Sequence, residues 1–87
     1  MSFPDAKLDA DVIADRLGVF LTDKGVGATL REVTAEVSDA AARTSSWAGA
    51  IRMARRIARY YAKSERYMHA VIAGLIADEY QWLRENQ

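Results

Sequence analysis

Basic side chains between positions 52 and 66 form the pattern in this chain that is best suited to chemistry with a partner. They recur at spacings of three and four residues, which places them on one side of an α-helix, with a tyrosine beside them. Guanidinium and ammonium groups bind carboxylates and phosphates. We therefore expect a partner-binding surface with Tyr60 as an aromatic anchor. Its residues are Arg52, Arg55, Arg56, Arg59, Tyr60, Lys63 and Arg66.

Other reactive side chains are isolated or lie in patterns typical of a solvated surface. His69 is the single histidine, and the chain has no cysteine, which excludes zinc knuckles, disulfides and thiol nucleophiles. Asp11 and Asp15 stand four residues apart, as do Glu32 and Glu36. Such pairs can hold a hard cation, but they usually form a solvated helix face. We expect no enzyme activity, no cofactor and no metal.

A second interpretation of the basic residues is DNA binding. The run TLREVTAEV, Thr29–Val37, resembles the first helix of the bacterial helix-turn-helix repressors. That resemblance implies a DNA-binding regulatory protein in which a second helix follows at once. Thr34 and Ser38 stand where such repressors usually have alanine and the glycine of the turn, and Asp39 replaces a core aliphatic residue. The motif is therefore degenerate, and DNA is the alternative to a protein partner.

Four helices and no strand are expected to position these residues, in a compact all-α bundle of three to four helices that forms a single domain over residues 1–87. Gly25 is expected to end the first helix. Thr29 and Glu32 form a capping box for the second. Thr44–Ser46 and Ser64 offer N-caps for the third and fourth. The expected helices span residues 9–24, 30–43, 46–63 and 65–85.

Apolar spacing within these segments predicts the core. The second segment buries Leu30, Val33, Val37 and Ala40 or Ala41, and the third buries Trp47, Ala50, Ile51, Ala54, Ile57, Ala58 and Tyr61. The fourth presents a broad apolar face formed by Met68, Val71, Ile72, Leu75, Ile76, Trp82 and Leu83. Glu79 falls inside that face. Its carboxylate needs a partner or water, so we expect an ion pair with an arginine or a frayed helix end.

A net charge of zero hides a segregated distribution of charge. Residues 44–66 carry six basic and one acidic group, net +5, whereas residues 1–43 are net −3 and residues 67–87 net −2. Two interpretations remain open. The acidic faces of the first two helices, in the same or a second subunit, neutralise the basic helix. Alternatively, the basic helix docks on an acidic or phosphate-bearing partner.

We expect a small regulatory or interaction protein, of the kind found in bacteria and phages, that docks its cationic helix face on an acidic protein surface. A chain of 87 residues has a small core, so a homodimer is expected to add stability. The chain has no apolar run long enough to span a membrane and no secretory signal at its start. With its lack of cysteine, this predicts a cytoplasmic protein.

Overall fold

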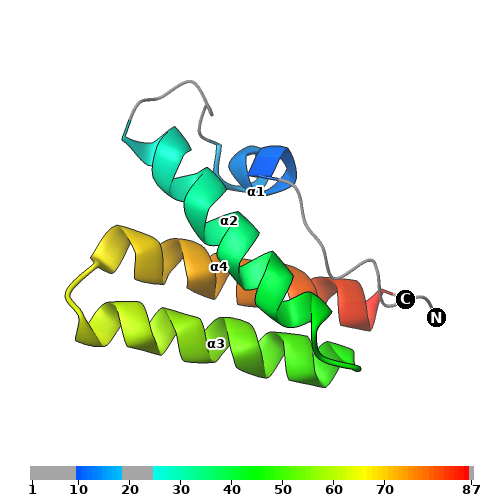
Figure 1. The fold of residues 1–87 in the computed structure, drawn as a ribbon. Coiled ribbons are helices and arrows are strands. Elements are labelled where there is room, and N and C mark those ends of the chain that lie inside the picture. Colours follow the sequence, from blue (N-terminus) through cyan, green and yellow to red (C-terminus); the bar gives the residue numbers. More distant parts are fainter. Residues whose placement is uncertain (1–9, 19–24, 87) are drawn as a thin grey trace.

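The computed structural model describes residues 10–18 and 25–86, which form four helices (Figure 1). They are α1 (Ala10–Leu17), α2 (Val26–Ala42), α3 (Trp47–Lys63) and α4 (Tyr67–Glu85). The described residues contain no strand, which confirms the predicted all-α class. α3 and α4 form an antiparallel hairpin, α2 crosses both of them diagonally, and α1 packs against α2.

The first helix is shorter than predicted. α1 ends at Leu17 instead of Lys24. Gly18 follows it with a φ of 68°, a left-handed conformation that glycine adopts without the steric cost of a Cβ atom. The Gly18 N–H donates to the Asp15 carbonyl at 3.3 Å. The predicted continuation over residues 19–24 lies outside the described residues.

The second helix begins earlier than predicted and without the predicted capping box. Gly25 is the N-cap of α2, and no side chain caps the helix. Thr29 lies one turn inside α2, where its hydroxyl donates to the Gly25 carbonyl at 3.0 Å. Residues 26–28, predicted as a loop, are helical. α2 then continues unbroken through Ser38 to Ala42, within one residue of the predicted end at residue 43. The turn that the helix-turn-helix resemblance implies at Ser38 is therefore absent.

The third helix matches its predicted bounds to within one residue, and local contacts explain both of its ends. Ser46 is the N-cap, and its hydroxyl accepts a hydrogen bond from the backbone N–H three residues on, at 3.0 Å. Beyond the C-terminal end, Glu65 has a φ of 60°, and the Arg66 N–H donates to the Tyr61 carbonyl at 2.9 Å, as in a Schellman motif. Ser64, predicted to cap α4, instead closes α3 by donating to a carbonyl of its last turn.

The core lies between α2 and the α3–α4 hairpin, and it contains most of the apolar residues predicted for α2 and α3. Ile57 and Ala58 are partly buried against it. Ala40, an alternative to Ala41 in the prediction, is only partly buried. The buried residues of the two helices include Leu30, Val33, Val37, Ala41, Trp47, Ala50, Ile51, Ala54 and Tyr61.

The core-facing side of α4 was predicted only in part. Ile72 and Ile76 are buried and Leu83 is partly buried, as predicted, but three other residues of the predicted face are exposed. Met68, Val71 and Trp82 are 47 %, 61 % and 47 % exposed. Tyr80, which was not predicted, is completely buried, and its ring centroid lies 6.1 Å from that of Trp47. Apolar residues occur around nearly the whole circumference of α4, so their spacing does not define one buried face.

Glu79 is buried and pairs with an arginine of its own chain. Arg16 Nε lies 3.2 Å from Glu79 Oε2, and Arg16 Nη2 donates to Glu79 Oε1 at 3.4 Å. The same guanidinium lies over the Trp82 ring, 5.0 Å from its centroid. The ion pair expected from the sequence therefore ties α1 to α4.

Candidate functional site: the cationic face of α3

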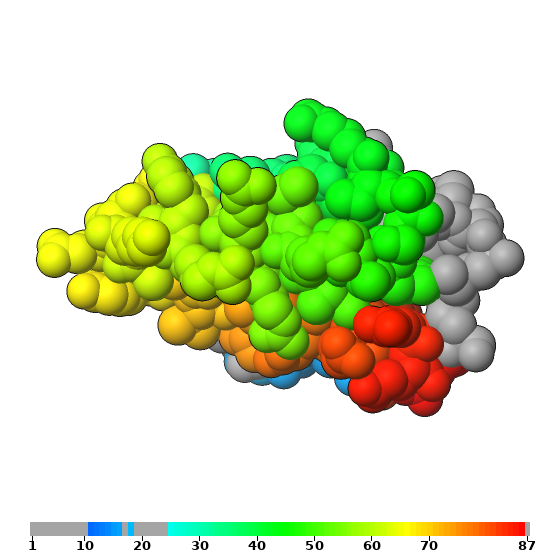
Figure 2. All heavy atoms as spheres, turned by 90° about the horizontal axis from the view of Figure 1, so that it is seen from below, coloured from blue at the N-terminus to red at the C-terminus, as the bar shows by residue number. Residues whose placement is uncertain are grey.

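The outer side of α3 carries a row of exposed basic residues. α3 occupies the middle of the view in Figure 2, with α4 along its lower edge. The apolar arc of the helix faces the core, so the charged arc is left in solvent, as the sequence predicted. We call this set the cationic face. It consists of Arg52, Arg55, Arg56, Arg59 and Lys63.

Most of the cationic face has no counter-charge within the described residues. Arg55 is the exception, with its Nη2 atom 3.8 Å from Asp78 Oδ1, and both side chains are about half exposed or more. Such exposed pairs contribute only about 0–1 kcal/mol. The remaining members make no ion pair or hydrogen bond through their side chains with another described residue. They are Arg52, Arg56, Arg59 and Lys63.

Acidic residues of α2 contact the tip of the α3–α4 hairpin and not the cationic face. Glu32 Oε1 lies 3.8 Å from Arg66 Nη2, and Glu32 Oε2 lies 3.5 Å from His69 Nε2. Glu36 accepts a hydrogen bond from the Tyr61 hydroxyl. Internal neutralisation by the acidic residues of α2, one of the two interpretations of the charge distribution, thus applies to Arg66. Among the described residues it leaves Arg52, Arg56 and Arg59 without an ion pair.

Arg66 belongs to this intramolecular cluster at the start of α4. Its Nη2 atom lies 2.8 Å from His69 Nε2, and its guanidinium lies 5.1 Å from the Tyr61 ring centroid. Burial first, and then the hydrogen bond to Glu36, raise the pKa of Tyr61 to about 12. Of the residues predicted to bind a partner, Arg66 is therefore the one that the structure sets apart from the cationic face.

Tyr60 lies at the edge of the cationic face, one helical turn after Arg56. Its side chain is 64 % exposed, and its ring meets that of Tyr61 edge-on at a centroid distance of 5.7 Å. An exposed aromatic ring that packs against a buried neighbour can add apolar contact to a charged surface, and it loses little side-chain entropy on binding. This position suits the anchoring role predicted for Tyr60.

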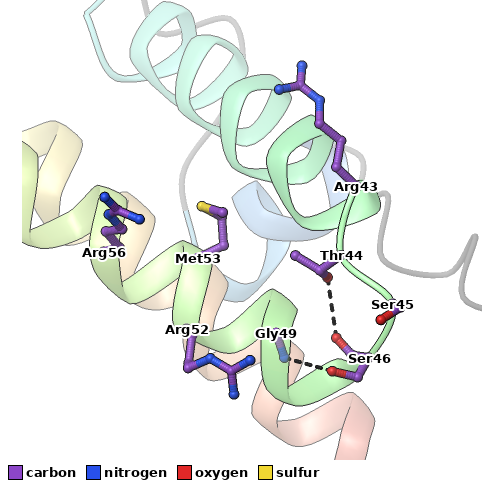
Figure 3. Close-up of a pocket in the computed structure, with 8 residues that line it drawn as sticks. All are labelled: Arg43, Thr44, Ser45, Ser46, Gly49, Arg52, Met53 and Arg56. Atoms are coloured by element: carbon purple, nitrogen blue, oxygen red, sulfur yellow. Dashed lines mark hydrogen bonds between the residues drawn. The ribbon is translucent and has the colours of Figure 1, made fainter.

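A pocket opens where the cationic face meets the turn between α2 and α3. Its volume is about 410 Å³, and Figure 3 shows side chains from both helices and from the turn around it. Two members of the cationic face and the C-cap residue of α2 supply three arginines, and no acidic side chain of the described residues lines the pocket. The lining residues are Arg43, Thr44, Ser45, Ser46, Gly49, Arg52, Met53 and Arg56.

Close packing fixes the turn beneath this pocket. The Thr44 hydroxyl donates to the Ala41 carbonyl at 2.6 Å and lies 3.4 Å from the Ser46 carbonyl oxygen. A Cβ atom at Gly49 would lie only 3.0 Å from Thr44 Cβ, so any other residue at this position would require Thr44 to shift by a few tenths of an ångström. Sequence reasoning missed Arg43, because its place beside the cationic face follows from how the turn folds back and not from helical spacing.

The described residues contain no group of three or more histidine, cysteine, aspartate or glutamate side chains that could hold a metal ion. No helix among them is long and apolar enough to cross a membrane. Comparison of the chain with family models, curated proteins and solved structures finds no match. Inference about function therefore depends on the cationic face and its pocket.

Proposed function

We propose that this protein is a small, non-enzymatic regulatory protein that docks the cationic face of α3 on an acidic surface of a protein partner. The observation that carries the proposal is the row of exposed cations on α3, of which all but Arg55 lack a counter-charge among the described residues. Complementary charge attracts a partner over long range and orients it before contact. Tyr60 then supplies apolar contact at the edge of the charged surface.

The way α3 is held supports docking without rearrangement of the fold. Trp47, Ala50, Ile51, Ala54 and Tyr61 bury the opposite side of the helix. The charged side chains therefore project from a fixed backbone, and only their own rotamer freedom is lost on binding. Since salt screens exposed charges, the affinity is expected to fall as ionic strength rises.

Duplex DNA is the second candidate ligand of the same face. The pocket between Arg43, Arg52 and Arg56 favours this candidate, because arginine binds phosphate oxygens in a bidentate geometry. Binding would use the outer side of α3 and would need no helix-turn-helix. DNA binding would also give a logarithm of affinity that falls against the logarithm of salt concentration by about 0.9 per phosphate contacted.

Two matched charge reversals test the proposal. Arg59→Glu with Lys63→Glu alters the cationic face, and Arg31→Glu with Arg84→Glu makes the same change in net charge elsewhere. All four side chains are exposed, and Lys63 and Arg84 each lie in the last turn of a helix. Each variant, tagged and immobilised, is incubated with a nuclease-treated extract of the source cells, after circular dichroism has shown that it is folded.

We expect the wild-type protein and the Arg31/Arg84 variant to retain the same protein partner, and the Arg59/Lys63 variant to lose it. Retention should also fall with added salt. Equal retention by both folded variants would contradict the proposal. Capture that is seen only in a parallel extract without nuclease treatment, together with competition by random duplex DNA, would identify nucleic acid and not a protein as the ligand.

The proposal places the protein in the cytoplasm. A chain without cysteine has no disulfide bond that the reducing conditions there would break. It also includes a homodimer, since a small core gains stability from a second copy. Sedimentation equilibrium at several protein concentrations measures the dimer directly. A monomer at all concentrations would remove the homodimer from the proposal but leave the docking surface in place.

A further inference from the structure

We propose that the pocket between Arg43, Arg52 and Arg56 binds a phosphate monoester, carried on a phosphorylated side chain of the partner that docks on the cationic face. The inference rests on the proposed function and names one group of the partner that this surface recognises. The pocket is continuous with the docking surface, because Arg52 and Arg56 belong to both. Arg43 extends that surface across the turn to the end of α2.

Charge is the first argument for an anionic occupant. Arg43, Arg52 and Arg56 line one pocket. Within residues 10–18 and 25–86, no acidic residue lines this pocket, and none of the three arginines makes an ion pair. Three like charges around one hollow repel one another until an anion enters. A phosphate monoester carries close to two negative charges at neutral pH, more than a carboxylate or a phosphodiester, and so fits three cations best.

Hydrogen-bond donors around the pocket fit the same ligand. Arginine presents a planar fork of N–H groups that matches phosphate oxygens. Ser45 is exposed beside these arginines at the rim, so its hydroxyl can donate to a ligand. The N-terminal end of α3 lies at the same place and adds a partial positive charge. The arginines carry the argument, and the helix end strengthens it.

Shape favours a phosphate on a side chain over a free ion. The volume of about 410 Å³ lies within the range of about 300–1,000 Å³ that is typical of small-ligand pockets. Met53 lies among the lining residues, between α2 and the arginines of α3 (Figure 3). Its thioether offers an apolar contact to the aliphatic stem of a phosphorylated residue, while the phosphate meets the guanidinium groups.

The backbone of the turn is held by local contacts, whereas the three arginine side chains are exposed and make no ion pair with another described residue. Thr44 hydrogen bonds and the close approach at Gly49 hold the backbone of the pocket. In Figure 3 the guanidinium groups of Arg43, Arg52 and Arg56 point in different directions around it. We expect a bound phosphate to draw them together, with ligand-dependent shifts of the backbone amide signals confined to the turn and the first turn of α3.

The test uses the full chain and two acidic peptides that differ only in whether one central serine is phosphorylated. Binding is measured by calorimetry and by amide chemical shifts. Charge-assisted hydrogen bonds to phosphate should make the phosphopeptide bind about 10-fold or more tightly than its unphosphorylated form. We expect amide shifts at Ser45, Ser46 and Gly49. The variant Arg43→Gln should abolish this preference, and Arg31→Gln, an exposed arginine elsewhere on α2, should keep it.

Variants at Arg43 distinguish a failure of this inference from a failure of the proposed function. Arg43→Gln leaves Arg59 and Lys63 intact, so it should remove the preference for the phosphopeptide, while the unphosphorylated peptide loses only the small attraction of one exposed charge. Arg59→Glu with Lys63→Glu should weaken both peptides equally and keep the ratio. Equal affinity of the two peptides for the wild-type protein would overturn the inference. So would an unchanged ratio in Arg43→Gln, or competition by a DNA duplex as effective as that by the phosphopeptide.

Discussion

Replacing Arg16 and Glu79 singly and together should show that the two side chains stabilise the fold as a pair. At the observed 3.2 Å between Arg16 Nε and Glu79 Oε2, two unit charges attract by about 1 kcal/mol in water and about 5 kcal/mol at the effective dielectric constant of ~20 that suits protein sites. The Arg16 side chain is 52 % exposed and that of Glu79 is 10 % exposed. Solvent thus screens one end of the pair, and we expect a coupling free energy of about 1–2 kcal/mol.

The single variants should differ in cost. Arg16→Ala leaves a buried carboxylate without its cation and should lower the free energy of unfolding by about 2–3 kcal/mol. Glu79→Gln removes the buried charge and keeps an acceptor for the guanidinium, so its cost should be about 1 kcal/mol. The double variant should cost less than the sum of the two single variants, because the neutral amide introduced at position 79 does not need a cation.

Urea unfolding followed by circular dichroism at the helix band measures these free energies without depending on Trp82, which contacts Arg16. The matched control pairs Glu79→Gln with Arg31→Ala, an exposed arginine that makes no ion pair with a described residue. Those two changes should add to within about 0.5 kcal/mol. Additivity in the Arg16 cycle as well would refute the role given to this pair in holding α1 on α4.

Other residues give predictions for stability and its pH dependence. The buried Thr34 hydroxyl has no hydrogen-bond partner among the described residues, so Thr34→Val should raise the free energy of unfolding by about 1 kcal/mol in urea titrations. Glu65→Gly should raise it by about 0.5–1 kcal/mol, because glycine accepts the φ of 60°; a loss would contradict the Schellman ending of α3. Burial raises the pKa of Tyr61 and of Tyr80 to about 12 from 10. Their neutral forms therefore stabilise the fold below pH 10, and this contribution is lost as pH rises towards 12. The melting temperature of the variant Tyr80→Phe should fall less steeply over that range than that of the wild-type protein.

The sequence predicted α3 well because two independent signals in it agree. Its apolar residues occupy one arc and its basic residues the opposite arc, and serine stands at the position of the N-cap. Both signals are local, so tertiary contacts do not change them. The exposed members of the cationic face follow directly from that pattern.

The prediction of α4 was less accurate because its apolar residues do not mark one side. Met68, Val71 and Trp82 have core-like side chains but face solvent. Tyr80 is buried instead, beside Trp47 and Ser38. Which side of such a helix is buried depends on where α2 crosses it, and helical spacing carries no information on that crossing.

The start of α2 and the pocket required the folded structure for another reason. Thr29 and Glu32 have the spacing of a capping box, but the helix extends beyond them to Gly25, so Thr29 bonds within the helix. Arg43 joins Arg52 and Arg56 only because the turn brings the end of α2 against the start of α3. Short-range sequence patterns predict individual helices, whereas the contact between the end of one helix and the start of the next depends on the tertiary fold.

Photo-cross-linking from the edge of the cationic face tests the central claim most directly. Tyr60 and Tyr67 are both 64 % exposed, and each can be replaced by benzoylphenylalanine in the full chain expressed in the source cells. From position 60 we expect an adduct with one protein that survives nuclease, and the adduct should vanish when Arg59→Glu and Lys63→Glu are added. It should persist when Arg31→Glu and Arg84→Glu are added instead. An adduct of equal yield in both charge-reversed backgrounds, or one formed from position 67 and not from position 60, would contradict docking through the cationic face.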